Sequence, residues 1–126
     1  MKQPIEPAPG QPPMRRYPRM AAEYVLAFRR LLPGGGETAP QFTRTRSVGL
    51  GGLMFESESP LDVGEMLRLE IVIGERTLKT DGVVIYAERR AEGLWNNGVQ
   101  FTGITDDERD VLLGAYLQRE YRITPL

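Results

Sequence analysis

The sequence predicts a small antiparallel β-domain, either a sandwich or a barrel, followed by one C-terminal helix. Short runs of alternating apolar and polar residues recur along the chain, and turns rich in glycine and proline separate them. The last such run is followed by a helix-capping sequence, Thr105-Asp106-Asp107-Glu108. A chain of 126 residues is long enough for one hydrophobic core and too short for two, so these elements belong to one domain.

The first 13 residues are predicted to form a leader outside this domain. They include five prolines and little to bury, which is typical of a disordered or polyproline-like segment. They lack the apolar stretch of a secretory signal, and no later run approaches the roughly 18 apolar residues of a membrane span. We therefore expect a domain over residues 14–126, a cytoplasmic location and no membrane insertion. The leader's alternative role is that of a short docking motif for a partner.

Three arginines stand within five residues at the start of the domain, in the segment Arg15-Arg16-Tyr17-Pro18-Arg19. Pro18 has no amide donor and disfavours a helix at the preceding residue, so the segment is predicted to be extended or to turn. Guanidinium groups make forked contacts with phosphates and with the O6/N7 edge of guanine. The segment is therefore either a solvated charge run or part of an anion-binding site.

Two strands are predicted after this segment. The first covers residues 21–28, with Tyr24, Leu26 and Phe28 on one face. A loop rich in glycine and proline, residues 32–40, leads into a second strand over residues 41–47. Arg44 and Arg46 share one face of this second strand, where they make a small cationic wall.

A glycine-rich turn follows the second strand and contains Gly49, Gly51 and Gly52. Glycine permits positive φ angles and lets a ligand approach the backbone, and successive amides in such a turn can point at an anion. The ordinary alternative is a hairpin or a bulge. The turn is not a dinucleotide fingerprint, because a strand that begins at Leu53 follows it rather than a helix.

Three further strands and a helix complete the domain. The strands are predicted over residues 66–73, 77–88 and 95–101, with turns at residues 74–75 and 91–93. The capping box predicts a helix over about residues 105–121, with Thr105 as the N-cap. The apolar stripe of this helix is expected to cover one end or side of the sheet structure.

The composition excludes most catalytic and metal sites. The chain has no cysteine and no histidine, which removes the usual zinc sites, the Cys/His and Ser/His nucleophile pairs and the commonest general base. We expect no catalytic residues and no metal site. The acidic cluster Asp106-Asp107-Glu108 suits the positive end of the helix dipole and needs no metal to explain it.

Charge is divided unevenly between the two parts of the chain. Residues 1–50 carry eight basic and three acidic groups, whereas the remainder carries eight basic and fourteen acidic groups. This division predicts an anionic partner for the N-terminal half. It does not predict DNA, because duplex binders usually carry a basic whole domain and this chain has a net charge of −1.

Several motifs stand in a specific order along the chain. Arg15 and Arg19 have RxxxR spacing, a small-residue turn ends in Gly51-Gly52-Leu53, and Gly98-Val99-Gln100-Phe101 precedes the capped helix. This order resembles that of the PilZ domain family over roughly residues 14–121. The resemblance implies an all-β fold, a six-stranded antiparallel barrel with a C-terminal helix. It also implies a ligand, the bacterial second messenger cyclic di-GMP.

The first half of the family's ligand motif is RxxxR. Arg15 and Arg19 match it fully, with Arg16 as the additional arginine beside it. The resemblance implies that the arginine segment is mobile when empty and closes on the ligand. Its guanidiniums would grip the guanine Hoogsteen edges and the phosphates.

The second half of the motif is Asp/Asn-x-Ser-x-x-Gly. Alignment on the glycine turn puts Ser47 at the acidic or amide position, Gly49 at the serine position and Gly52 on the final glycine, so only the glycine matches. Arg44 and Arg46 are expected to add positive charge near the phosphates. The backbone amides from Gly49 through Gly51 to Gly52 are available whatever the side chains are.

These features imply a cyclic di-GMP sensor without catalysis or a resident cofactor, in which ligand binding changes the surface offered to an unidentified partner protein. The alternative is a PilZ-like adaptor that has lost the ligand and acts by protein–protein interaction in motility, pilus or chemotaxis machinery. A third candidate is a small RNA-binding barrel, which the basic N-terminal half favours. That candidate lacks an obvious exposed aromatic pair for base stacking.

Overall fold

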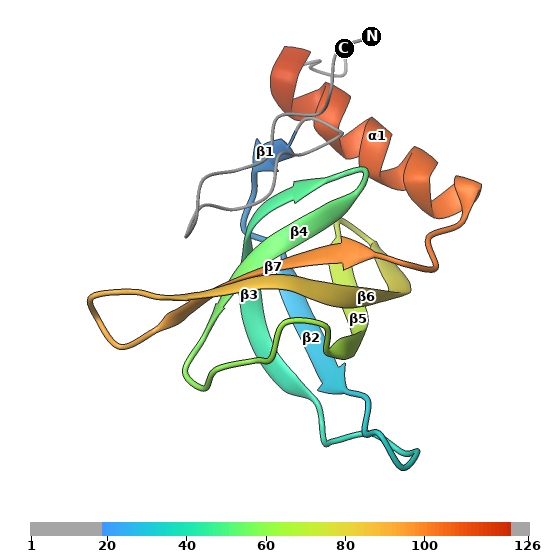
Figure 1. Ribbon diagram of the computed structural model, residues 1–126. Coiled ribbons are helices and arrows are strands. Elements are labelled where there is room, and N and C mark those ends of the chain that lie inside the picture. The colour runs from blue at the N-terminus through green and yellow to red at the C-terminus, as the bar shows by residue number, and fades with distance from the viewer. Residues whose placement is uncertain (1–18, 122–126) are drawn as a thin grey trace, which may run out of the picture.

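A computed structural model describes the backbone of residues 19–121 and the side chains of residues 20–118 (Figure 1). The leader predicted over residues 1–13 lies outside the described residues, as do Arg15 and Arg16 of the arginine segment. The part that is described begins at Arg19, the second arginine of the RxxxR spacing.

Seven strands and one helix follow one another in residues 19–121. They are β1 (Arg19–Ala21), β2 (Val25–Arg30), β3 (Gln41–Gly49), β4 (Gly52–Ser57), β5 (Met66–Ile73), β6 (Arg76–Arg89), β7 (Trp95–Phe101) and α1 (Asp106–Tyr121). Six strands close into a barrel in the order β3-β2-β5-β6-β7-β4, because β4 also pairs with β3. All pairings are antiparallel. The predicted six-stranded barrel with a C-terminal helix is confirmed.

The strand predicted over residues 21–28 is wrong in one respect, because it is broken into β1 and β2. Both strands pair with β3, and Thr45 of β3 lies opposite the break with 1% of its surface exposed. The Thr45 hydroxyl accepts a hydrogen bond from the Tyr24 amide at 2.8 Å and donates one to the Ala22 carbonyl at 2.6 Å. One buried side chain thus satisfies backbone groups that a regular ladder would have paired.

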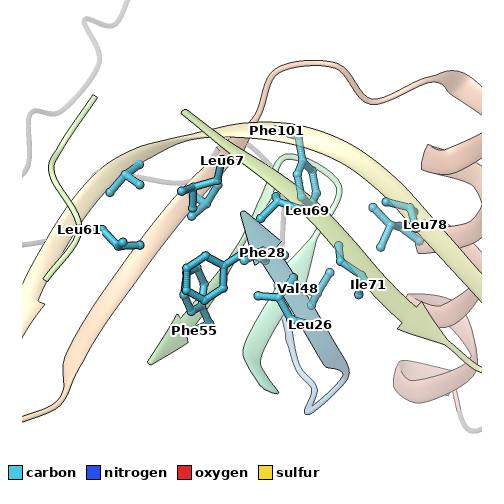
Figure 2. Close-up of a cluster of buried hydrophobic side chains, with 14 residues drawn as sticks. Leu26, Phe28, Val48, Phe55, Leu61, Leu67, Leu69, Ile71, Leu78 and Phe101 are labelled. Atoms are coloured by element: carbon cyan, nitrogen blue, oxygen red, sulfur yellow. The ribbon is translucent and has the colours of Figure 1, made fainter. Parts of the chain in front are cut away.

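Apolar side chains from the inner faces of the strands fill the barrel (Figure 2). The predicted alternation in β5 is confirmed, since Leu67, Leu69 and Ile71 have no exposed surface. The rings of Phe28 and Phe55 lie side by side with centroids 4.9 Å apart and planes tilted by 42° (Figure 2). Burial of each such side chain contributes about 1.5–3 kcal/mol, so this core is the main source of the barrel's stability.

The helix α1 begins with the predicted capping box. The Thr105 amide donates to Glu108 Oε1 at 2.9 Å, and the Glu108 amide donates to Thr105 Oγ1 at 3.2 Å. Leu112 is buried against the barrel core, and the helix lies across the barrel next to β1 (Figure 1). Among residues 19–121, no helix is long and apolar enough to cross a membrane.

The helix α1 also lies next to the end of β3. An apolar pocket of about 50 Å³ separates α1 from β1 and β3, and its lining includes Met20, Leu50, Leu112 and Tyr116. Leu50 belongs to the glycine-rich turn, so α1 packs beside the segment that holds the predicted ligand motif. The helix therefore lies against β1 and against the turn, with a small apolar cavity between them.

The Gly98-to-Phe101 motif has a packing explanation. An added Cβ at Gly98 would lie 2.0 Å from Cε1 of Tyr86, because the Tyr86 ring of β6 lies across the glycine in β7. Val99 and Phe101 point into the core. The motif therefore consists of a glycine that lies under an aromatic ring and two apolar residues, Val99 and Phe101, that face the core.

Arg30, the last residue of β2, forms a forked ion pair with Glu65. Arg30 contacts both carboxylate oxygens of Glu65, with Nη2 at 2.8 Å from Oε1, and the Asp62 amide donates to Oε1 at 3.0 Å. The hydrogen bond from Arg30 holds the pKa of Glu65 below its ordinary value, although burial opposes this. The same hydrogen bond raises the pKa of Arg30.

Candidate ligand-binding site

The pairing of β1 with β3 brings the two halves of the predicted motif together. Arg19 lies opposite Gly49, Met20 opposite Val48, and Ala21 opposite Ser47. Paired strands are about 4.8 Å apart, so the backbone of the second RxxxR arginine is next to the backbone of the glycine turn. About thirty residues separate these segments in the sequence, and β3 is the element that joins them.

The glycine turn is a β-hairpin, which was the ordinary alternative in the sequence. Val48 of β3 pairs with Leu53 of β4, and the Gly51 carbonyl accepts a hydrogen bond from the Phe101 amide at 2.9 Å. In residues 19–121 the positive φ angles fall at other glycines, in the loop after β2 and in later turns. Gly49 and Gly52 are instead buried within the ends of β3 and β4.

Ser47 occupies the position where the family motif has an acid or an amide. It pairs with Ala21 of β1 and with Met54 of β4. Its Oγ atom is buried and has no hydrogen-bond partner among the described residues. A buried hydroxyl without a hydrogen-bond partner costs free energy until something satisfies it.

A β-bulge places Arg46 on the outside of the barrel. Thr45 pairs with Phe55 and Ser47 with Met54, so Arg46 is an extra residue in β3 relative to β4. The bulge that the sequence allowed in the glycine turn therefore lies in the strand before it. Arg44 and Arg46 are both exposed.

An open groove of about 530 Å³ runs along this part of β3. It adjoins Ser47, because Arg46 and Ser47 are consecutive, and its lining brings together Glu23, Val25, Phe42, Arg44, Arg46 and Glu56. Phe42 has 74% of its surface exposed. The structure thus gathers two of the predicted arginines with an accessible aromatic ring beside the motif.

The two groove arginines differ in their ion pairs. Arg46 Nη1 donates to Oε1 of Glu56, and Arg90 Nη1 donates to the same oxygen at 2.6 Å. Among the ion pairs of the described residues, none involves Arg44. The positive charge available in the groove therefore belongs mainly to Arg44, while Glu56 offsets that of Arg46.

Sequence reasoning missed Glu56. A hairpin with the observed Val48–Leu53 pair and no bulge would set Glu56 opposite Thr45, a residue of the inner face. The bulge at Arg46 moves Phe55 opposite Thr45, which brings Glu56 level with Arg44 on the outer face. Counting along the hairpin could have found Glu56 only if the bulge had been located first.

Comparison with known families decides the identity of the domain. The PilZ domain family model matches residues 13–118 of the chain. The chain belongs to the PilZ domain family. The resemblance inferred from the RxxxR spacing, the glycine turn and the Gly98-to-Phe101 motif is thereby confirmed. No curated protein sequence matches the chain.

Solved structures share the fold of this PilZ domain at low sequence identity. The Bacillus subtilis inhibitor of motility MotI/DgrA is 19% identical with a TM-score of 0.73, over 89% of this chain and 54% of that one. The PilZ domain of Escherichia coli YcgR with c-di-GMP is 20% identical with a TM-score of 0.64, over 86% and 94%. The K. pneumonia MrkH–c-di-GMP complex is 16% identical with a TM-score of 0.69, over 86% and 53%. The chain therefore spans about half the length of MotI and of MrkH.

Proposed function

We propose that this PilZ domain binds cyclic di-GMP between its arginine segment and the β3–β4 hairpin, and that binding changes the surface presented to a partner protein. The observation that carries the proposal is the pairing of Arg19 with Gly49, which sets the two halves of the family motif side by side. Two structures with the same fold, the YcgR PilZ domain and MrkH, contain c-di-GMP. MotI, with the same fold, is an inhibitor of motility.

The chemistry of the residues suits a cyclic dinucleotide. Arg15 and Arg19 provide forked donors for phosphates and for the O6/N7 edges of the guanines. Ser47 adds a buried hydroxyl without a partner among the described residues, and Arg44 adds a positive charge outside the ion pairs of that part of the chain. The role requires no catalysis and no resident cofactor.

Titration calorimetry with cyclic di-GMP tests this proposal. We expect heat of binding from the wild-type chain and a loss of affinity of roughly a hundredfold or more in Arg15→Ala/Arg19→Ala, because each charged or forked contact is worth about 1–3 kcal/mol. Arg76→Ala, which removes an exposed arginine of the β5–β6 hairpin, is the matched control and should bind as the wild type does. No heat at tens of micromolar protein, or undiminished binding in the double variant, would overturn the proposal.

The alternative function is that of an adaptor that acts without the ligand. It is favoured by Ser47 and Gly49, which replace the acid and the serine of the motif. This alternative predicts no heat in the titration. It also predicts that a pull-down recovers the same partner protein in equal amount with and without cyclic di-GMP.

A further inference from the structure

Ser47 stands in the acidic position of the motif and cannot supply the carboxylate that this position usually supplies. A guanine presents two donors, N1–H and the 2-amino group, on its Watson–Crick edge, and a carboxylate is the acceptor that suits them. Ser47 has one hydroxyl and no charge. If a carboxylate reads the Watson–Crick edge of the guanine in this site, it has to come from elsewhere in the fold.

We propose that Glu56 is the carboxylate that reads the guanine edge in place of an acid at position 47. This inference rests on the proposed function, since it names a residue that selects the base of the same ligand. Ser47 pairs with Met54, and Glu56 is the next residue of β4 on the outer face. The carboxylate thus comes from the strand adjacent to Ser47 and lines the groove with Arg44.

The Glu56 carboxylate is held in place before any ligand arrives. Arg46 and Arg90 approach it from β3 and from the β6–β7 connection, and both donate to Oε1. Among the side chains of residues 20–118, the second oxygen of Glu56, Oε2, accepts no hydrogen bond. A carboxylate whose orientation is fixed by two guanidiniums loses little side-chain entropy when Oε2 takes an N–H of the base.

A carboxylate in this position also discriminates between bases. Adenine has an acceptor at N1 and no 2-amino group, so it would leave Oε2 desolvated and unpaired. Selection of guanine then comes from a penalty on adenine as well as from the new hydrogen bond. The phosphate contacts are the same for both cyclic dinucleotides, so they contribute affinity without selecting the base.

Calorimetric titrations with cyclic di-GMP and cyclic di-AMP test the role of Glu56. The wild-type chain should bind cyclic di-GMP and discriminate against cyclic di-AMP. Glu56→Ala should lower the affinity for cyclic di-GMP by roughly tenfold to a hundredfold and reduce the ratio of the affinities for cyclic di-GMP and cyclic di-AMP. Glu56→Gln should lower the affinity for cyclic di-GMP less, because its amide oxygen still accepts a hydrogen bond. In the Glu56→Ala background, Ser47→Asp should recover roughly tenfold or more, because it puts a carboxylate on the neighbouring strand.

Control variants separate the possible failures. Glu70→Ala removes one carboxylate from β5, outside the groove, and should leave both affinities unchanged. Thermal melting followed by circular dichroism confirms that each variant is folded. Equal or tighter cyclic di-GMP binding by folded Glu56→Ala would overturn this inference alone, because Glu56 would then only compete with the phosphates for Arg46. No binding by the wild-type chain would overturn the proposed function as well.

Discussion

Two arginine–glutamate clusters join strands of the barrel, and they use their carboxylates differently. In the Arg30–Glu65 pair, both oxygens of Glu65 take donors from the fork of Arg30, and the Asp62 amide adds a further hydrogen bond. In the groove, Arg46 and Arg90 converge on one oxygen of Glu56. Both oxygens of Glu65 therefore have donors inside the protein, whereas Oε2 of Glu56 has none among the side chains of residues 20–118.

The positions of the two clusters agree with this difference. The two carboxylates are similarly shielded, because the Glu65 side chain is 13% exposed and that of Glu56 18%. The arginines differ: the Arg30 side chain is 28% exposed, whereas those of Arg46 and Arg90 are 51% and 38% exposed. Charged hydrogen bonds contribute more when water is excluded, and exposed ion pairs contribute little. We therefore assign the Arg30–Glu65 pair to stability and the groove cluster to binding, and each assignment makes a prediction.

The largest expected effect on stability is that of Glu65→Gln. The change removes the charge from three hydrogen bonds and leaves the half-buried Arg30 without its counter-ion, so we expect a loss of about 2 kcal/mol in the free energy of unfolding. Urea denaturation measures this loss, and Glu75→Gln in the exposed β5–β6 turn is the control. A loss below about 0.5 kcal/mol, the usual size for surface changes, would contradict the structural role.

The same pair predicts a pH dependence of stability. Because Arg30 lowers the pKa of Glu65 in the folded state, the unfolded chain binds more protons as pH falls below the ordinary value of 4.5. The contribution of the pair is therefore complete above pH 4.5 and is lost as pH falls through the folded pKa, by at most about 1.4 kcal/mol per pH unit. The stability difference between the wild type and Glu65→Gln should be constant from neutral pH to 4.5 and shrink below it. A stability difference between the wild type and Glu65→Gln that grows as pH falls below 4.5 would contradict this prediction.

The strands and the helix were predictable because their signals are local. The alternation of Leu67, Leu69 and Ile71 specifies the buried face of β5, and Thr105 with Glu108 specifies the start of α1. The break between β1 and β2 was not predictable in this way. It depends on the Thr45 hydroxyl, which bonds to backbone groups more than twenty residues earlier in the chain.

The candidate site likewise has residues with a local sequence signal and one residue whose position depends on contacts between distant segments. The residue types of the glycine turn and of RxxxR were visible in the sequence, and the pairing of Arg19 with Gly49 gave them a common location. Glu56 became visible only through the register of two strands and the bulge at Arg46. A side chain that is recruited by a one-residue shift in register leaves no signature in the local sequence.

The smallest expected effect on stability is that of Glu56→Gln, and it is the most direct comparison with Glu65→Gln. Glu56→Gln should lower the free energy of unfolding by less than about 1 kcal/mol, because its arginine partners are exposed and can be solvated by water. Urea denaturation in parallel with Glu65→Gln gives the two values under the same conditions. A loss at Glu56 equal to that at Glu65 would mean that the groove cluster also serves to hold β3, β4 and the β6–β7 connection together. A small loss, combined with weaker cyclic di-GMP binding in the same variant, would show that the protein keeps this carboxylate for its ligand rather than for its fold.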